Sequence, residues 1–297
     1  MNTLNNRNEI SDVSKGILDL IFKLSAEYST HLEYIGHNFE NNIDGELKRI
    51  LLPYMIAIYG KMLTAYRLLN GYSLEDLHPE WVGVSNDPII LYDLIRSMYE
   101  CFLQSHFIQN RYQSYEDRKY IILWWGIRAL SERAQLATTS NLENQQLKRE
   151  SIEIDNDTQQ IVKQHSDRLS KDKNDFGFYK TNKLANWPKP GKLYDLAGIH
   201  KSHHEFLYKI SSLYAHAEPF ALMQVRHIYH NNIHNLDDNI LTHGRYIVDL
   251  SLIALQNFSK IFPEMKVRMD NSTSLHEMIN KAEQYFRISR AAISKRE

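Results

Sequence analysis

Apolar residues recur three and four positions apart along most of this chain, which is the period of an α-helix. Between residues 88 and 109, for example, Leu91, Leu94, Ile95 and Met98 fall on one stripe. The same period predicts further helices at 10–35, 45–69, 116–136, 239–262 and 274–295. The pattern therefore predicts an all-α fold. The segment 239–262 is apolar enough to be a buried core helix.

Proline, glycine and asparagine mark where these predicted helices begin and end. Asp87 supplies an N-cap in front of Pro88, and proline is favoured at the first helical position. Asn70 and Gly71 end the second predicted helix. Within that helix, Pro53 either introduces a kink or belongs to the first turn, because proline has no backbone N–H to donate.

One long segment, residues 141–172, is polar and of mixed charge, so we expect an exposed helical arm or hairpin with an interruption near 155–157. Residues 171–192 hold glycine and Pro-Lys-Pro-Gly and predict irregular structure, followed by one helical turn at 193–197. The sequence as a whole predicts a helical bundle with a long polar helical arm.

We expect a single helical domain over residues 1–297. It comprises an N-terminal helix within 1–40, a bundle at 40–262 that includes the arm, and a C-terminal helix within 263–297. The chain contains only 11 glycines and 7 prolines, which argues against a sandwich, a barrel or a Rossmann sheet, since these need frequent turn residues.

The charges balance, with 35 basic and 36 acidic residues, so no global basic field attracts nucleic acid. Cys101 is the only cysteine, which excludes a disulfide within the chain and favours a reducing compartment. No uncharged apolar run reaches the roughly 18 residues of a membrane span. We therefore expect a cytoplasmic protein that does not enter a membrane.

The most informative polar residues are Tyr208, Ser212 and His216, which recur every fourth position and form one stripe on a helix that ends before Pro219. Either they form a satisfied polar seam between helices, or His216 binds an anion or acts as an acid or base. The chain has no Gly-x-Ser-x-Gly turn, so Ser212 does not fit the usual serine nucleophile.

A second candidate cluster is Arg96 with Glu100, four residues apart in an apolar helix. The pair is either a surface ion pair of about 0.3 kcal/mol or part of a functional site. A third candidate is Trp187 in a proline- and glycine-rich loop. This indole either anchors the loop on the core or gates a pocket.

Histidine is dense near the C-terminal third of the chain, where eight of the fourteen histidines lie between residues 200 and 243. They are His200, His203, His204, His216, His227, His230, His234 and His243. The pairs His200 with His204 and His230 with His234 have a spacing that allows metal chelation. There is no His-Glu-x-x-His, no Glu-x-x-His of the di-iron kind and no cysteine partner, so surface and loop histidines are the better interpretation, and we expect neither a metal nor another cofactor.

Taken in order, these motifs resemble a bacterial family of helical proteins of unknown function, DUF5677. The motifs are Arg-x-x-x-Glu at Arg96, the loop at Trp187 with the following short helix, and Tyr-x-x-x-Ser-x-x-x-His from Tyr208. The resemblance covers roughly residues 40–260. The family's motif usually ends in His-Pro-Ser, whereas this chain has His-Ala-Glu-Pro, beginning at His216. The resemblance implies a bundle in which Arg96, Glu100, Ser212 and His216 converge.

Such proteins also resemble, more distantly, the HEPN ribonucleases of defence and toxin systems. The HEPN signature is an arginine separated from a histidine by four to six residues, and no arginine of this chain has that spacing. Two functions stay open. The first is a ligand-sensing or protein-interaction module in bacterial stress or phage defence. The alternative is a metal-independent ribonuclease or nucleotide phosphodiesterase that uses His216 and Arg96.

The expected partners follow from these two functions. The polar cluster suits a small anion, a nucleotide or RNA, and the module interpretation adds a homodimer or a protein partner.

Overall fold

The computed structural model is all-α, as the hydrophobic pattern predicts. It describes residues 10–35, 39–73, 84–85, 88–135, 141–179, 183–215, 223 and 236–294. The long helices are α1 (Asp12–Ile35), α2 (Ile43–Leu69), α3 (Pro88–Asn110), α4 (Tyr115–Arg133), α5 (Asn141–Gln164), α12 (Arg245–Phe258) and α14 (Thr273–Ser294). Shorter α-helices are α6 (Ser166–Phe176), α7 (Pro190–Leu196), α8 (Lys201–His204), α9 (Ser211–Ala215), α11 (Leu236–Asn239) and α13 (Pro263–Asn271).

Two π-helical segments and one small ribbon complete the described elements. The π-helices are η2 (Glu205–Ile210) and η3 (Ile240–Gly244). The strands β1 (Tyr72–Ser73) and β2 (Val84–Ser85) pair antiparallel.

The contacts divide the chain into two compact units. The first unit is Met1–Asn38, Leu51–Leu103 and Ile199–Glu297, and the second is Phe39–Ile50 and Gln104–Gly198. The single domain expected over residues 1–297 stays a prediction.

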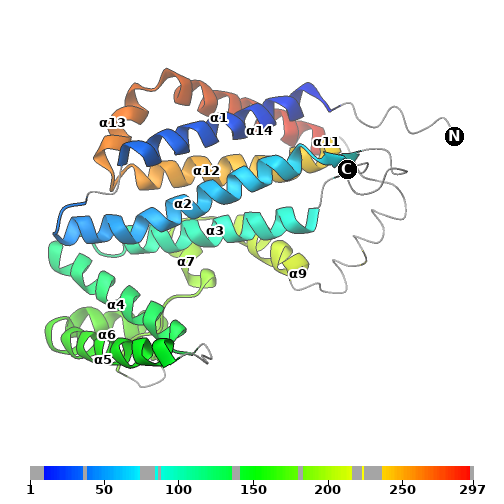
Figure 1. The fold of residues 1–297 in the computed structure, drawn as a ribbon. Coiled ribbons are helices and arrows are strands. Elements are labelled where there is room, and N and C mark those ends of the chain that lie inside the picture. The colour runs from blue at the N-terminus through cyan, green and yellow to red at the C-terminus, as the bar shows by residue number, and fades with distance from the viewer. Residues whose placement is uncertain are drawn as a thin grey trace. The chain divides into compact units, whose positions relative to one another are not determined.

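In the first unit, α1 packs along α12 and α14 (Figure 1). Its Tyr28 is fully buried and donates a hydrogen bond of 2.9 Å to the backbone carbonyl of Ser251 in α12. The Ser251 hydroxyl in turn donates to the Met62 sulfur of α2 at 3.2 Å. Since each polar atom in this chain of contacts has a partner, three helices pack without an unsatisfied hydroxyl.

A glycine permits the close packing of α1 against η3. A Cβ atom added at Gly244 would lie 2.6 Å from the Cγ2 atom of Ile17, closer than two carbon atoms can pack. Gly244 and Ile17 are both buried. Any larger residue at position 244 would therefore push these two elements apart.

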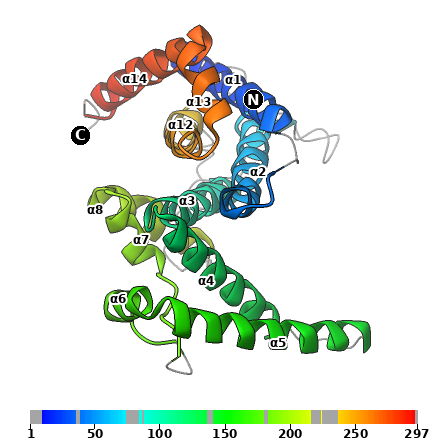
Figure 2. The ribbon, with the colours of Figure 1, turned by 90° about the vertical axis from the view of Figure 1, so that its left-hand side faces the viewer.

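The second unit is built on α4, against which α5 packs, while α5 also packs against α6 (Figure 2). A capping box starts α4, because the Ser114 hydroxyl accepts from the Asp117 N–H while the Asp117 carboxylate accepts from the Ser114 N–H. Asp172 of α6 is fully buried and accepts hydrogen bonds from the Arg111 guanidinium at 2.6 Å and from the Tyr120 hydroxyl at 2.9 Å.

The polar segment 141–172 is helical, but the predicted interruption near 155–157 is wrong. The chain leaves the helical conformation at His165, between α5 and α6. His165 is 1% exposed and its ring lies 5.7 Å from that of Tyr120. Burial of this ring against α4 outweighs the turn preference of Asp155-Asn156-Asp157, whose side chains face water, fully or in part, on an uninterrupted helix.

Two further boundaries differ from the sequence prediction. The C-terminal segment 263–297 contains two helices, α13 and α14, because the Ser272 hydroxyl caps a new helix by accepting from the Leu275 N–H at 3.1 Å. Pro53 lies well inside α2, which continues past it, so it does not belong to the first turn. Its missing N–H falls on an exposed position.

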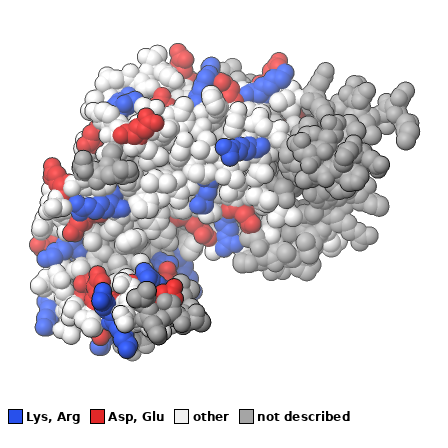
Figure 3. Space-filling model, viewed as in Figure 1, with Lys and Arg blue, Asp and Glu red and all other residues white. Residues whose placement is uncertain are grey.

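No helix in the described part of the chain is both long enough and apolar enough to cross a membrane. On the face shown in Figure 3, Lys and Arg side chains are mixed with Asp and Glu among uncharged residues. Neither sign of charge forms a continuous patch on the described part of that face, in keeping with the balanced net charge of −1.

The buried carboxylate of Asp172 yields the first testable prediction. Asp172→Asn removes the charge that pairs with Arg111 and should lower the free energy of unfolding by about 3 kcal/mol, measured by urea denaturation. The matched control is Glu132→Gln, which neutralises the carboxylate of an exposed pair with Arg128 in the same unit and should cost less than about 1 kcal/mol. Equal costs for the two variants would contradict a dominant role for the buried pair.

A second prediction concerns pH. Burial lowers the pKa of His243 from 6.5 to about 4. Between these values the unfolded chain binds more protons than the folded protein, so stability should fall as pH drops from 6.5 towards 4. His243→Phe keeps a ring in the same space and removes the titration.

Melting temperatures of wild type and His243→Phe across this range give the test. The variant should show a shallower loss of stability, by up to about 1.4 kcal/mol per pH unit. Parallel curves for the two proteins would show that His243 does not titrate with unfolding.

Candidate functional site

The candidate site lies in the first unit, where α3 packs antiparallel to the segment formed by α8, η2 and α9. Residues nearer the N-terminus of α3 contact residues nearer the C-terminus of the other segment. The contacts pair Tyr99 with His204, Arg96 with Tyr208 and Ser212, and Tyr92 with Tyr214. Residues from two distant parts of the chain therefore form one continuous row of polar and aromatic contacts.

The Arg96 guanidinium is the centre of this row. Its Nε donates to the Glu100 carboxylate at 3.1 Å, and its Nη1 donates to the Ser212 hydroxyl at 3.4 Å. The Cζ atom lies 5.0 Å from the centre of the Tyr208 ring, a cation–π distance. The predicted proximity of Arg96 and Glu100 to the helix that carries Ser212 is confirmed.

The site is partly accessible to solvent. The Arg96 side chain is 19% exposed and that of Glu100 is 37% exposed. This ion pair is therefore neither a fully solvated surface pair nor a fully buried one. His216, the fourth predicted member of the cluster, lies outside the described residues.

A buried hydrogen bond lies beside the arginine. The hydroxyl of Tyr99, which is fully buried, and the Nδ1 atom of His204 are 3.0 Å apart. The His204 ring also stacks on Tyr208, with ring centres 5.3 Å apart and planes at 13°. Burial lowers the pKa of His204, so the imidazole is neutral at neutral pH. The Tyr208 ring is therefore in contact with both this imidazole and the Arg96 guanidinium.

The polar stripe does not lie on a straight α-helix, as the four-residue spacing predicted. Residues Glu205–Ile210 form a π-helix, in which each hydrogen bond spans five residues instead of four. In an α-helix, eight residues leave an angular offset of about 80°. The wider turns of the π-helix reduce this offset, so that both His204 and Ser212 face α3.

An aromatic cluster continues the row at its other end. Tyr92 stacks on Tyr214 with ring centres 4.2 Å apart, and the ring of His243 from η3 meets Tyr92 edge-on at 4.5 Å. His243 is 3% exposed, its Nδ1 lies 3.1 Å from the carbonyl of Asn239, and its Nε2 has no hydrogen-bond partner among the described residues. Two π-helical segments thus flank the same part of α3.

The sequence prediction missed His204, Tyr99 and Tyr92, although a signal for each was present. His204 precedes Tyr208 by four residues and extends the predicted stripe by one turn. Tyr92 and Tyr99 lie four residues before and three residues after Arg96, so they share its face of α3. Both tyrosines read equally well as core residues, since a helix face alone does not identify its partners.

Trp187 lies in the second unit and anchors its loop. The indole meets Phe107 and Trp124 nearly edge-on, with ring centres 5.2 Å and 4.8 Å away, and its Nε1 donates to the Gln104 side chain at 2.6 Å. The expected packing of Trp187 on helical residues is confirmed. A position of Trp187 near the His216 end of the bundle is a further prediction, and His216 lies outside the described residues.

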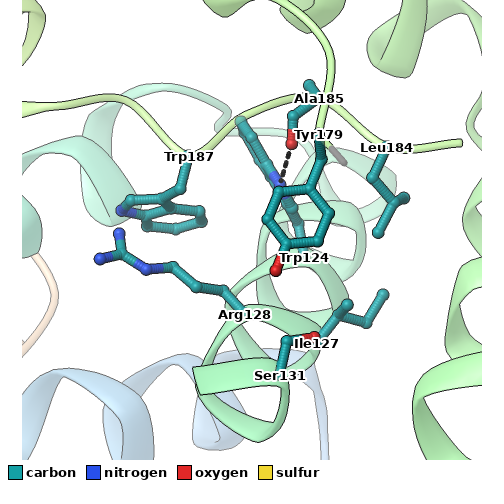
Figure 4. Close-up of a pocket in the computed structure, with 8 residues that line it drawn as sticks. All are labelled: Trp124, Ile127, Arg128, Ser131, Tyr179, Leu184, Ala185 and Trp187. Atoms are coloured by element: carbon teal, nitrogen blue, oxygen red, sulfur yellow. Dashed lines mark hydrogen bonds between the residues drawn. The ribbon is translucent and has the colours of Figure 1, made fainter. Parts of the chain in front are cut away.

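A small pocket opens beside Trp187, with a cavity volume of about 30 Å³. Figure 4 shows residues from α4 on one side and from the segment that follows α6 on the other. The lining residues are Trp124, Ile127, Arg128, Ser131, Tyr179, Leu184, Ala185 and Trp187. Trp187 forms one wall of this pocket, and its role as a gate stays a prediction.

The described histidines do not form a metal centre. His200 caps α8 by accepting from the Ser202 N–H at 3.3 Å, whereas His204 points to Tyr99, so this pair does not share a ligand position. Within the described residues, no group of three His, Cys, Asp or Glu side chains is arranged to hold a metal ion. The pair His230 with His234 lies outside these residues.

Comparisons with known proteins agree with the motifs. No curated protein and no solved structure matches the chain. A family model described as a family of unknown function, DUF5677, matches residues 91–235, a narrower range than the 40–260 predicted from the motifs. The matched range includes Arg96, Glu100, Trp187, Tyr208 and Ser212. The resemblance to the DUF5677 family that the motifs predicted is therefore confirmed over residues 91–235.

Proposed function

We propose that this protein is a ligand-sensing module that binds a small anion at Arg96. The observation that carries the proposal is the state of the guanidinium, which Glu100, Ser212 and Tyr208 hold in one orientation while it stays partly open to solvent. The ligand class is a phosphate or carboxylate group, free or as part of a nucleotide or RNA. The proposed setting is bacterial stress or phage defence.

The chemistry of arginine supports this ligand class. The guanidinium is planar, always charged, and presents paired N–H donors that match two oxygens of a phosphate or carboxylate. A side chain already fixed by stacking on Tyr208 loses little conformational entropy when the ligand binds. The Ser212 hydroxyl, next to the guanidinium, adds a donor for a third ligand oxygen.

Glu100 competes with an incoming anion for the Arg96 guanidinium. Its carboxylate neutralises Arg96 in the unliganded protein, so an incoming anion competes with it for the same guanidinium. Binding then releases or reorients Glu100, and this change is the event that a sensing module could transmit. A partner protein or a second copy of the chain would read that change.

The test is phosphate binding, measured as the rise in melting temperature with millimolar inorganic phosphate, ATP or an oligouridylate. Arg96→Gln and Arg96→Lys should each weaken binding about tenfold or more, because neither keeps the paired donors. Glu100→Gln should strengthen it roughly threefold to tenfold, because the competing charge is gone. Arg67→Gln changes an exposed arginine of α2 and is the matched control, with wild-type binding expected.

Two results would contradict this function. If phosphate, ATP and the oligonucleotide all leave the wild-type melting temperature unchanged, Arg96 is part of a structural seam. If Glu100→Gln weakens binding, Glu100 contacts the ligand directly and the competition model is wrong.

The alternative proposal is phosphodiester cleavage of RNA or a nucleotide without a metal. Ser212, one helical turn before His216 in the sequence, bonds to Arg96, which favours a shared role for the two segments. In this mechanism His216 acts as acid or base, and Arg96 stabilises the phosphate charge.

His216→Ala separates the two proposals. If the protein is an enzyme, this change should abolish RNA turnover and leave the melting temperature nearly unchanged. If His216 completes a polar seam, the change should cost roughly 1–3 kcal/mol of stability. In that case wild type should also cut no RNA, with or without added metal.

A further inference from the structure

The pocket beside Trp187 and the segment around it form a surface that the Arg96 site does not use. We propose that this surface docks an acidic peptide segment of a partner protein, with one aliphatic side chain of the peptide inserted into the pocket. The proposal concerns residues of the second unit only, so it does not depend on ligand binding at Arg96.

The pocket suits an aliphatic group. Its walls are mainly aromatic rings and aliphatic side chains, and its cavity volume of about 30 Å³ is roughly twice the space that one water needs. It therefore accommodates one or two methyl groups, such as the end of a leucine or valine side chain. Removing these groups from water provides an apolar anchor for the peptide.

The segment that forms one wall of the pocket is rich in positive charge. From residue 176 to residue 194 the sequence contains four lysines and no acidic residue, although the whole chain has a net charge of −1. Lys183 immediately precedes the lining residue Leu184, and Lys189 follows Trp187 by two positions. Lys183, Lys189 and Lys192 are exposed, and among the described residues none of them forms an ion pair. These cations are available to the carboxylates of a bound segment.

Arg128 links the pocket to the charged surface. Its guanidinium lies over the Trp187 ring, with the Cζ atom 5.4 Å from the ring centre (Figure 4). Its Nε donates to the Glu132 carboxylate at 2.8 Å. Glu132 is 61% exposed, so an acidic residue of the peptide can replace it at low cost. Tryptophan, tyrosine and arginine are also the residues that most often dominate binding energy at protein interfaces.

The geometry favours a peptide over a single-stranded nucleic acid. A base needs an open aromatic face on which to stack. The Trp187 ring is already in contact with Phe107, Trp124 and the Arg128 guanidinium, and the pocket next to it is too small for a base.

The test is fluorescence anisotropy with a labelled peptide of sequence Glu-Glu-Leu-Glu-Glu and the full-length protein at low salt. Replacing leucine by alanine in the peptide should weaken binding about tenfold, since the anchor is lost. The double variant Lys183→Glu with Lys189→Glu should weaken binding about tenfold or more through loss of charge complementarity. The matched control is Lys148→Glu with Lys163→Glu, two exposed lysines of α5 in the same unit, which should bind as wild type does.

A second variant tests the pocket itself. Ser131→Leu places a larger side chain in the pocket and should abolish the preference for leucine over alanine while leaving the charge dependence intact. Because Ser131 is not fully buried, the melting temperature should stay near that of wild type.

Three outcomes would overturn the proposal. The first is no binding of the leucine peptide. The second is equal binding of the leucine and alanine peptides by wild type. The third is an oligouridylate that binds in a manner sensitive to Lys183 and Lys189 when the peptide does not, which would identify a nucleic-acid surface. Phosphate binding at Arg96 can succeed or fail independently of each result.

Discussion

The hydrogen bond between the Tyr99 hydroxyl and the His204 imidazole constrains the whole candidate site. Both side chains are buried, and a buried polar group without a partner costs about 1–3 kcal/mol, so this hydrogen bond favours one alignment of the two elements. This preference limits how far α3 and the segment 201–215 can slide along one another. At that register Arg96 lies against Tyr208 and Ser212. The position of the arginine is thus a consequence of a neutral contact about one helical turn away, which keeps the guanidinium in place before any ligand arrives.

The second unit depends on an analogous buried contact, which involves the charged carboxylate of Asp172. Asp172 is fully buried, and Arg111 and Tyr120 donate hydrogen bonds to its carboxylate. Since an unpaired buried carboxylate is far more costly than an unpaired hydroxyl, this contact holds α6 more tightly than the apolar contacts alone. The segment that follows α6 then reaches α4 through Trp187 and forms the pocket. In each unit, a buried polar contact positions a partly exposed arginine beside an aromatic ring.

The helices were predictable because burial of one face leaves a clear period in the sequence, as in α1 and α3. The boundaries at His165 and Ser272 were not, because local turn preference competes there with tertiary burial and capping. The pairing of Arg96 with Ser212 followed from the motif order and its family resemblance, whereas the His204 contact could not be assigned, since a histidine in a helix gives no sign of its partner. Neither π-helix was predictable, because a π-helical turn holds about one residue more than an α-helical turn and has no distinctive amino-acid composition.

The proposed function depends most directly on the Arg96 guanidinium, held by Glu100 and Tyr208, receiving an anion. Crystals soaked in tungstate or selenate, which mimic phosphate and scatter anomalously, would locate bound anions without reference to any assay. We expect an anomalous peak within hydrogen-bond distance of the Arg96 guanidinium and near the Ser212 hydroxyl, with the Glu100 carboxylate displaced. Peaks only elsewhere on the protein, with the Arg96–Glu100 pair intact, would contradict it.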